Sequence, residues 1–264
     1  MIDELTKTRR YELKYTIDEH LAEEIKADIR HICSLDENVG PGETGYIVNN
    51  LYFDTPDFRF YYDTKFKKAT RFKPRIRFYG EHAKDLIWPE IKYRHDSIIW
   101  KKRHCVPIGD WPGLLEPANV VEETQIRPRL DRFEEIIHWY GARPVLHVRY
   151  FREPYVADID SYGRVTFDRR LCYRKLEDTA GLNYDEKDMM YYDDPLTTRN
   201  DYSPVILEIK VKTLVPVWVV ELIRRHHLNQ RGFSKYCYGI DYVLETPGCR
   251  IPILDPLSSL KRRA

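Results

Sequence analysis

The chain lacks the features that mark secreted, membrane-spanning and zinc-stabilised proteins. Its 264 residues include five cysteines, an odd number, and no two of them form a CxxC pair, so we expect reduced thiols and no structural zinc. The longest apolar run, LVPVWVVELI at residues 214–223, is too short and too interrupted to cross a bilayer. The opening residues MIDELTKTRR contain no apolar stretch of the kind found in signal peptides. These absences predict a cytoplasmic protein without a transmembrane segment of its own.

The motifs of several common enzyme classes are also missing. The sequence contains no Walker A loop, no GxSxG and no HExxH. GPGETG at residues 40–45 matches GxGxxG, but it follows a helical pattern and precedes a strand, the reverse of a dinucleotide-binding fold, so we interpret it as a turn. Because neither an internal repeat nor a Gly/Ser linker divides the chain, we predict one domain over residues 1–264, with a core at 10–245 and a peripheral C-terminal tail.

The charge balance excludes a simple electrostatic function. Charged residues make up 32% of the chain, above the usual quarter, yet the formal net charge is only +1. Binding to nucleic acid or to an anionic membrane needs a net or clustered positive field. We therefore expect no nucleic-acid partner, and any functional positive charge has to be clustered within the fold.

Hydrophobic periodicity predicts an α+β fold that is rich in antiparallel strands and has few helices. Alternating segments predict strands at residues 10–15, 46–55, 73–79, 87–94, 98–108, 144–160, 163–171 and 204–213. Helical spacing is found at residues 16–32, 128–140 and 216–227, and Thr16 with Glu19 fits a capping box at the first of these helices. We interpret the acidic segment 176–203 as a solvated loop, and we expect the helix at 216–227 to plug or cover the sheet.

Five of the predicted strands carry charged side chains on one face and apolar ones on the other. The charged faces consist of Arg10, Glu12 and Lys14; Lys73, Arg75 and Arg77; Glu90, Lys92 and Arg94; Arg164, Asp168 and Arg170; and Glu208, Lys210 and Lys212. A solvated face is the ordinary interpretation of one such strand. Five strands that favour Arg and Lys instead predict a groove or a barrel interior lined with cations, with helices covering the apolar outer faces.

Clustered cations of this kind need a counter-charge, because leaving them unpaired in a dry interior costs several kcal/mol per ion. Arginine binds phosphate oxygens bidentately and lysine acts as a point charge, so a polyphosphate anion suits the pattern. A glutamate precedes a lysine by two residues at 12/14, 90/92 and 208/210. A glutamate has the wrong sign for phosphate but is a suitable ligand for a divalent cation that bridges to it.

The residues resemble those of a known family. The relevant segments, in order, are ELKY (12–15), LYFDTPDFRFYY (51–62), RIRFYG (75–80), EIKYR (90–94), YFREPY (150–155), RVTFD (164–168), LEIKVK (207–212) and FSKYCYG (233–239). Together they resemble the VTC-type polyphosphate polymerase domain, which belongs to the CYTH-like triphosphate tunnel metalloenzymes. By this resemblance, the chain would be a bacterial-type relative of that domain. The resemblance implies an antiparallel β-barrel tunnel, with helices packed outside and at one end.

The same resemblance implies a set of site residues. The phosphate-binding cations would be Lys14, Arg75, Arg77, Lys92, Arg152, Arg164, Lys210 and Lys235. A further lysine would come from IIWKKRH, where we choose Lys101 and keep Lys102 as a close alternative. Glu208 would be the metal ligand, with Glu12 and Glu90 as weaker candidates. Arg10 replaces the first glutamate of the wider superfamily's N-terminal motif, which favours the polymerase-like branch.

The implied function is a polyphosphate polymerase that transfers the terminal phosphate of ATP to a growing inorganic polyphosphate chain, with Mn²⁺ or Mg²⁺ as cofactor. Two alternatives stay open: a triphosphatase that uses the same site with water as acceptor, and a module that binds polyphosphate or inositol polyphosphate without turnover. Family membership further implies a membrane-protein partner, which would hold the domain at the inner face of a membrane.

Overall fold

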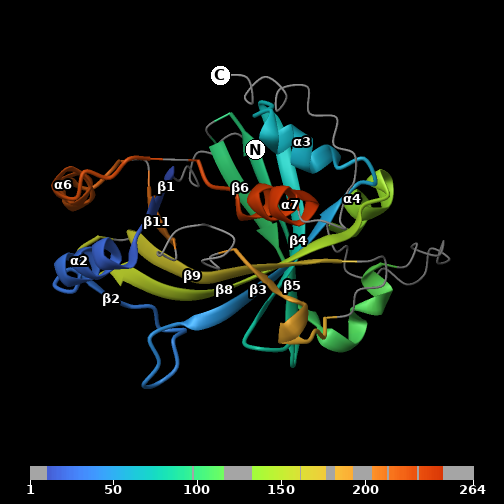
Figure 1. Ribbon diagram of the computed structural model, residues 1–264, viewed down its shortest axis with the longest axis horizontal. Coiled ribbons are helices and arrows are strands. Elements are labelled where there is room, and N and C mark those ends of the chain that lie inside the picture. The colour runs from blue at the N-terminus through green and yellow to red at the C-terminus, as the bar shows by residue number, and fades with distance from the viewer. Residues whose placement is uncertain are drawn as a thin grey trace, which may run out of the picture.

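One large antiparallel sheet organises the computed structural model of the protein (Figure 1), which describes residues 11–96, 98–115, 133–160, 162–176, 182–192, 204–212, 214–230 and 232–245. The described strands are β1 (Tyr11–Ile17), β2 (Cys33–Leu35), β3 (Tyr46–Asp54), β4 (Thr70–Tyr79), β5 (Leu86–His95), β6 (Ile98–Arg103), β7 (Val106–Pro107), β8 (Arg143–Ala157), β9 (Arg164–Lys175), β10 (Met190–Tyr191) and β11 (Val205–Val211). The described helices are α2 (Glu19–Ile29), α3 (Arg59–Lys65), α4 (Phe133–Tyr140), α6 (Val217–Arg225) and α7 (Lys235–Glu245). None of these helices combines the length and apolar character needed to cross a bilayer.

The main path of the sheet runs β1-β11-β9-β8-β3-β4-β5-β6, and every neighbouring pair is antiparallel. The sheet curls back on itself. This is shown by a contact between Lys92 on β5 and Glu12 on β1, with 2.5 Å between Nζ and Oε2. No backbone ladder joins β1 to β5 or β6 among the described residues. The predicted antiparallel tunnel fold is therefore confirmed, as a curled sheet in which the edge strand β1 meets β5, the neighbour of the other edge strand β6, through side chains.

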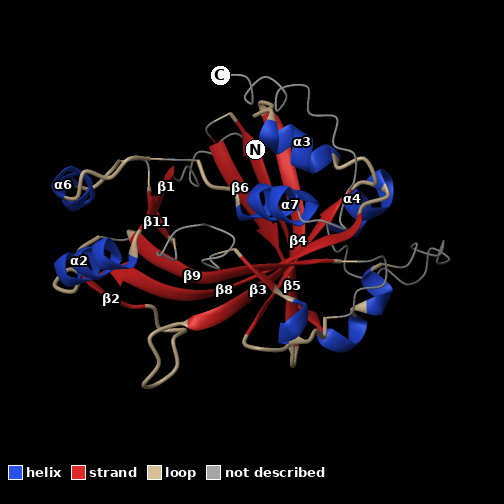
Figure 2. Cartoon of the chain, in the orientation of Figure 1, coloured by secondary structure: helices blue, strands red, loops and turns tan. Residues whose placement is uncertain are grey.

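The two faces of the sheet separate apolar from charged residues. On the outer face, Leu51, Ile76 and Ile91 belong to one buried cluster, which α4 covers. A second outer cluster joins β9 and β11 to Ile25 of α2 and Leu222 of α6. Figure 2 shows these two helices together at one end of the molecule. These apolar residues pack outward against helices, and the charged residues that alternate with them on the same strands turn inward, as the alternating pattern predicts.

Helix α7 packs on the inner face at one end of the curled sheet. Its Tyr236 and Ile240 join a third buried cluster with Val148 of β8 and Tyr173 of β9. A Cβ at Gly239 would come within 2.6 Å of the Tyr173 ring, so only glycine allows this close approach. Tyr236 also donates a hydrogen bond to the buried Asp54 carboxylate at the end of β3. These contacts position the first turn of α7 against the charged strands.

The structure corrects three predictions of secondary structure and adds one helix. The segment 98–108 is not one strand, because β6 ends at Arg103 and β7 follows separately. The first helix begins one residue after Asp18, which accepts a hydrogen bond from Leu21 N, so the Thr16 capping box is wrong. Segment 176–203 is not simply a solvated loop: β10 pairs with β9, and Met189 is buried, while 177–181 and 193–203 lie outside the described residues. The helix predicted at 216–227 is observed as α6 and covers the outer face, one of its two predicted roles, whereas α7, which the periodicity missed, packs inside.

Candidate functional site

A buried carboxylate organises the cations of β8 and α7. Asp168 on β9 is fully buried and accepts two parallel hydrogen bonds from the Arg152 guanidinium, at 2.7 and 2.8 Å. Its Oδ2 also accepts a 2.6 Å hydrogen bond from Lys235 Nζ. Burial opposes ionisation of Asp168, but Arg152 and Lys235 outweigh it and lower the pKa to about 2. The carboxylate is therefore ionised and holds two predicted phosphate ligands in fixed orientations.

Glu208 on the adjacent strand β11 is also buried but is held less tightly. Its oxygens lie 3.4 Å from Lys210 Nζ, 4.0 Å from Lys14 Nζ and 3.8 Å from Arg152 Nη2. Burial opposes its ionisation, yet Lys14, Lys210 and Arg152 keep the Glu208 pKa well below its usual range. The carboxylate accepts no hydrogen bond from any side chain that the structure describes, so its oxygens stay available to another partner.

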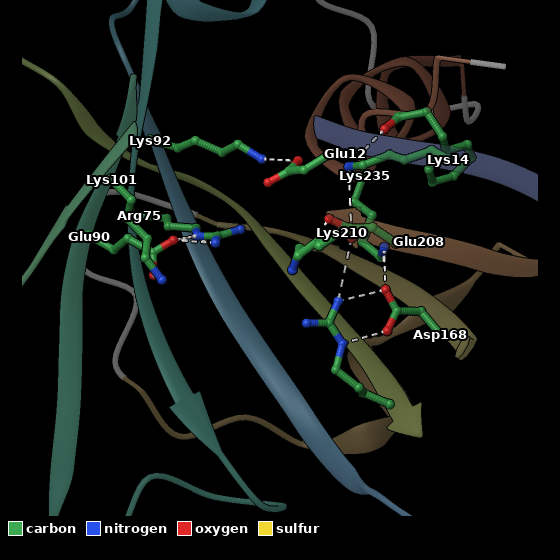
Figure 3. A network of polar contacts seen from close by, with 12 residues as sticks. Glu12, Lys14, Arg75, Glu90, Lys92, Lys101, Asp168, Glu208, Lys210 and Lys235 are labelled. Atoms are coloured by element: carbon green, nitrogen blue, oxygen red, sulfur yellow. Dashed lines mark hydrogen bonds and ion pairs between the residues drawn. The ribbon is translucent and has the colours of Figure 1, made fainter. Parts of the chain in front are cut away.

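Figure 3 shows the opposite wall of the inner face, where Arg75, Glu90 and Lys101 lie together. Arg75 donates to Glu90 through Nε at 2.9 Å and through Nη2, and Lys101 Nζ lies 3.6 Å from the other Glu90 oxygen. Arg75 Nη1 also donates to the Tyr52 hydroxyl at 2.9 Å. Glu90 is fully buried and, despite that burial, the cations keep its pKa below the usual range. This second carboxylate orients Arg75 as Asp168 orients Arg152.

The register decides between the two lysine candidates of β6. Lys101 pairs with Lys92, which lies on the inner face, whereas Lys102 pairs with Ile91, which is buried in the outer cluster. Directly opposed residues of an antiparallel pair share a face. The structure therefore places Lys101 inside and Lys102 outside.

The remaining predicted cations differ in their positions. Arg77 is buried on β4 and donates through Nε to Asn50 Oδ1 at 2.9 Å. Lys92 pairs with Glu12 across the seam between β5 and β1. Arg164 is different, because its side chain is 51% exposed at the start of β9 and its only described ion pair is with Asp36, at 3.6 Å. Arg10 lies outside the described residues.

Two tyrosines of the inner face were not among the predicted site residues. Tyr150 on β8 has Arg152 Cζ 5.2 Å and Lys235 Nζ 4.8 Å from its ring centroid. Tyr52 on β3 has Arg75 Cζ at 5.7 Å from its ring and stacks on Tyr236 of α7, with 4.9 Å between centroids. The two-residue spacing of Tyr150 and Arg152 on β8 is the signal that could have identified Tyr150, whereas Tyr52 is recognised only from its register opposite Arg75 on β4. The aromatic faces support the guanidinium and ammonium groups through cation–π contacts.

A comparison with protein families assigns the chain. The family model described as the VTC domain matches residues 9–244. The chain belongs to the VTC domain family. Among solved structures, this VTC domain is similar to a Vibrio parahaemolyticus protein provisionally assigned as an adenylate cyclase, with a TM-score of 0.44, 10% identity and coverage of 88% of this chain and 98% of that chain.

Two further solved structures are similar to this VTC domain. The PH1819 protein of Pyrococcus horikoshii gives a TM-score of 0.43 and 12% identity, with coverage of 88% of this chain and 99% of that one. The Mimivirus capping enzyme triphosphatase gives a TM-score of 0.32 and 8% identity, with coverage of 86% and 94%.

The donor set of this VTC domain fits a divalent cation that is shared with a ligand. No group of three or more His, Cys, Asp or Glu side chains able to hold a metal occurs in the described part of the chain. Glu208 and Glu12 lie on the paired strands β11 and β1, and repulsion by Glu208 acts to raise the pKa of Glu12. Mg²⁺ commonly takes one or two protein carboxylates and completes its shell with water and phosphate oxygens. Two carboxylates in a cation-rich site match that type of coordination.

Proposed function

We propose that this VTC domain is a metal-dependent phosphoryl-transfer enzyme that extends inorganic polyphosphate with the terminal phosphate of ATP. The observation that carries the proposal is a concentration of cations on the inner face of a chain that belongs to the VTC family. Seven different elements contribute these cations, which are Lys14, Arg75, Arg77, Lys92, Lys101, Arg152, Lys210 and Lys235. The carboxylates Glu12, Glu90, Asp168 and Glu208 neutralise only part of this charge. The remainder suits a multiply charged linear anion.

The residues divide the work of binding and charge stabilisation. Asp168 holds Arg152 and Lys235, and Glu90 holds Arg75, so these three cations are oriented before a phosphate chain enters. Such preorganised donors stabilise the charge that develops in phosphoryl transfer without reorganising at the moment of reaction. Glu208, assisted by Glu12, would hold Mn²⁺ or Mg²⁺, which when bound neutralises charge on the phosphate oxygens. No covalent enzyme intermediate is required.

The acceptor distinguishes the proposal from its main alternative. A phosphate chain end as acceptor gives polyphosphate and ADP, whereas water at the same position gives ADP and orthophosphate. The purified protein should be incubated with ATP and Mn²⁺ and the products separated by chain length. Long-chain polyphosphate is the expected product, and release of orthophosphate alone would replace the polymerase with a triphosphatase.

Site variants test whether the inner face carries the activity. We expect Lys210→Ala and Arg75→Ala to abolish product formation, because each removes a cation from the proposed phosphate path. Lys102→Ala is the matched control, since Lys102 is exposed on the outer side of β6. Full activity in Lys210→Ala would refute the site assignment. Phosphate-chain binding by the wild type without any turnover would favour the binding-only alternative.

A further inference from the structure

Lys73 lies on the inner face beside the predicted phosphate ligands but was not assigned to them. It precedes Arg75 by two residues on β4, so both side chains are on the same face, and it pairs in register with Lys92 on β5. Its Nζ donates a 3.0 Å hydrogen bond to Ser234 Oγ. Ser234 precedes α7 and accepts from Cys237 N, so Lys73 connects β4 to the start of the inner helix.

The charges around Lys73 differ from those around its neighbours. Lys92, Arg75 and Lys101 each lie within 4 Å of a carboxylate oxygen. Lys73 forms no ion pair with any carboxylate in the described part of the chain. Among the described lysines of the inner face, Lys73 is the one without a carboxylate partner from the described residues.

Each packed element presents either a cation or a neutral group to Lys73. Lys92 faces it from β5, Lys14 from β1 and Arg71 from its own strand, while Ser234 contributes a hydroxyl from just before α7 and Cys237 a thiol from its first turn. Burial raises the pKa of that thiol, so it is uncharged at neutral pH. Burial lowers the pKa of Lys73 most, the neighbouring Cys237 opposes this, and repulsion by Lys92, Lys14 and Arg71 lowers the pKa further, to about 7. A large share of the protein therefore carries an uncharged amine here at neutral pH.

We propose that Lys73, which faces the inner side of the sheet without a carboxylate partner among the described residues, is a contact for the phosphate chain and takes up one proton when anionic phosphate comes to lie beside it. An opposite charge at close range favours the charged form of a lysine, so the bound chain supplies the counter-ion that the fold omits. The proton comes from solvent, and no covalent bond is made or broken. This inference rests on the proposed binding of a phosphate chain to the inner face, but not on polymerisation.

Proton uptake can be counted by calorimetry. Inorganic tripolyphosphate is titrated into the protein at pH 8 with EDTA, in two buffers that differ in ionisation enthalpy. The dependence of the observed heat on the buffer gives the number of protons taken up. With a pKa of about 7 only about one lysine in ten is charged at this pH, so Lys73 should contribute close to one proton per bound tripolyphosphate.

Three variants isolate the contribution of Lys73 from the titration of tripolyphosphate itself. Lys73→Arg carries a permanent charge, so it should bind with about one proton fewer than the wild type. Lys73→Met should lose the same proton and bind more weakly by about tenfold or more. Lys102→Arg, the same substitution on the outer side of β6, should match the wild type. The ratio of wild-type to Lys73→Arg affinity should fall by up to about tenfold per pH unit above pH 7.

The outcomes separate this inference from the proposed function. Equal proton counts in the wild type and Lys73→Arg would overturn the role of Lys73. Tripolyphosphate that does not bind the wild type at all would overturn both proposals. Proton uptake that depends on Lys73 in a protein making only orthophosphate would support the inference and reject the polymerase.

Discussion

Asp168 and Glu208 occupy neighbouring strands and are both buried, yet they differ in their hydrogen bonds to, and distances from, the surrounding cations. Asp168 accepts charge-assisted hydrogen bonds of 2.6 to 2.8 Å from Arg152 and Lys235. Glu208 stands 3.4 to 4.0 Å from three cations and accepts hydrogen bonds from none of them. The oxygens of Asp168 are occupied by hydrogen bonds that orient protein groups, while those of Glu208 remain available to a ligand such as a metal ion. Two acids of similar burial thus divide into a structural counter-charge and a candidate metal ligand.

The largest expected effect comes from removing the available carboxylate. We expect Glu208→Gln to lower the metal-dependent transfer rate by about a hundredfold or more, because the ligand for the charge-neutralising cation is lost. Binding of tripolyphosphate in EDTA should be retained, since the cations stay in place and a negative charge has been removed. The assays are steady-state turnover with Mn²⁺ and metal-free calorimetry. Glu37→Gln, an exposed carboxylate, is the control, and equal loss in both variants would contradict the assignment.

Asp168→Asn should instead weaken both the fold and the activity. Breaking a buried pair leaves Arg152 and Lys235 uncompensated, which typically costs about 3–5 kcal/mol of unfolding free energy. Turnover at a temperature where the variant is folded should fall by about tenfold, because the two cations lose their orientation. Urea unfolding and steady-state kinetics measure the two effects. If stability were unchanged while activity disappeared, Asp168 would belong with Glu208 as a ligand.

Acid unfolding gives an independent view of Asp168. Its folded pKa of about 2 lies below the unfolded value of 3.8, so the ionised carboxylate stabilises the fold above pH 4 and this contribution is lost as the pH falls toward 2. The loss should be about 2 kcal/mol over that interval. The difference in unfolding free energy between wild type and Asp168→Asn should therefore shrink between pH 5 and pH 2. A constant difference would mean that the carboxylate is not held ionised by its partners.

The two adjacent lysines of β6 test the inner and outer faces with one substitution. Lys101→Ala should raise KM for ATP by about threefold to tenfold, because Lys101 lies beside Glu90 on the inner face. Lys102→Ala should leave KM and kcat unchanged. The opposite pattern in steady-state kinetics would mean that the register of β5 and β6 is shifted by one residue.

Arg164→Ala should have the smallest effect among the predicted ligands. The Arg164 side chain is half exposed, and its one described ion pair, with Asp36, is long at 3.6 Å. Its contribution to phosphate binding should therefore be that of a surface charge. We expect less than about a twofold change in turnover with ATP. A loss comparable to that of Lys210→Ala would move Arg164 into the phosphate path.

Much of the fold follows from the two-residue alternation of the strands. The pattern of Glu208 and Lys210 against Leu207 and Ile209 correctly assigns inner and outer faces, because burying one face fixes the register. Family membership is confirmed by the family model, whereas the roles of the site residues and the single-domain organisation remain predictions.

Other features could not be read from local patterns. Asp168 was visible in the alternation, but its role depends on Lys235, which lies 67 residues away. Helix α7 was missed although Tyr236, Ile240 and Val243 are spaced for one buried helical face, because its tyrosines and its central Gly239 are poor helix formers. Lys73 could not be distinguished from the other lysines, since the absence of a carboxylate partner is a property of the folded neighbourhood.

The meeting of Lys92 and Glu12 has a mechanical consequence. Elsewhere around the curled sheet, adjacent strands are held by rows of backbone hydrogen bonds, each contributing about 0.5–1.5 kcal/mol. At this seam the described contact is one partly exposed ion pair, an interaction commonly worth about 1 kcal/mol or less. The wall is therefore least resistant to separation along one line parallel to its strands. Under the proposed function, a long phosphate chain would not have to be threaded by its end, because it could enter from the side.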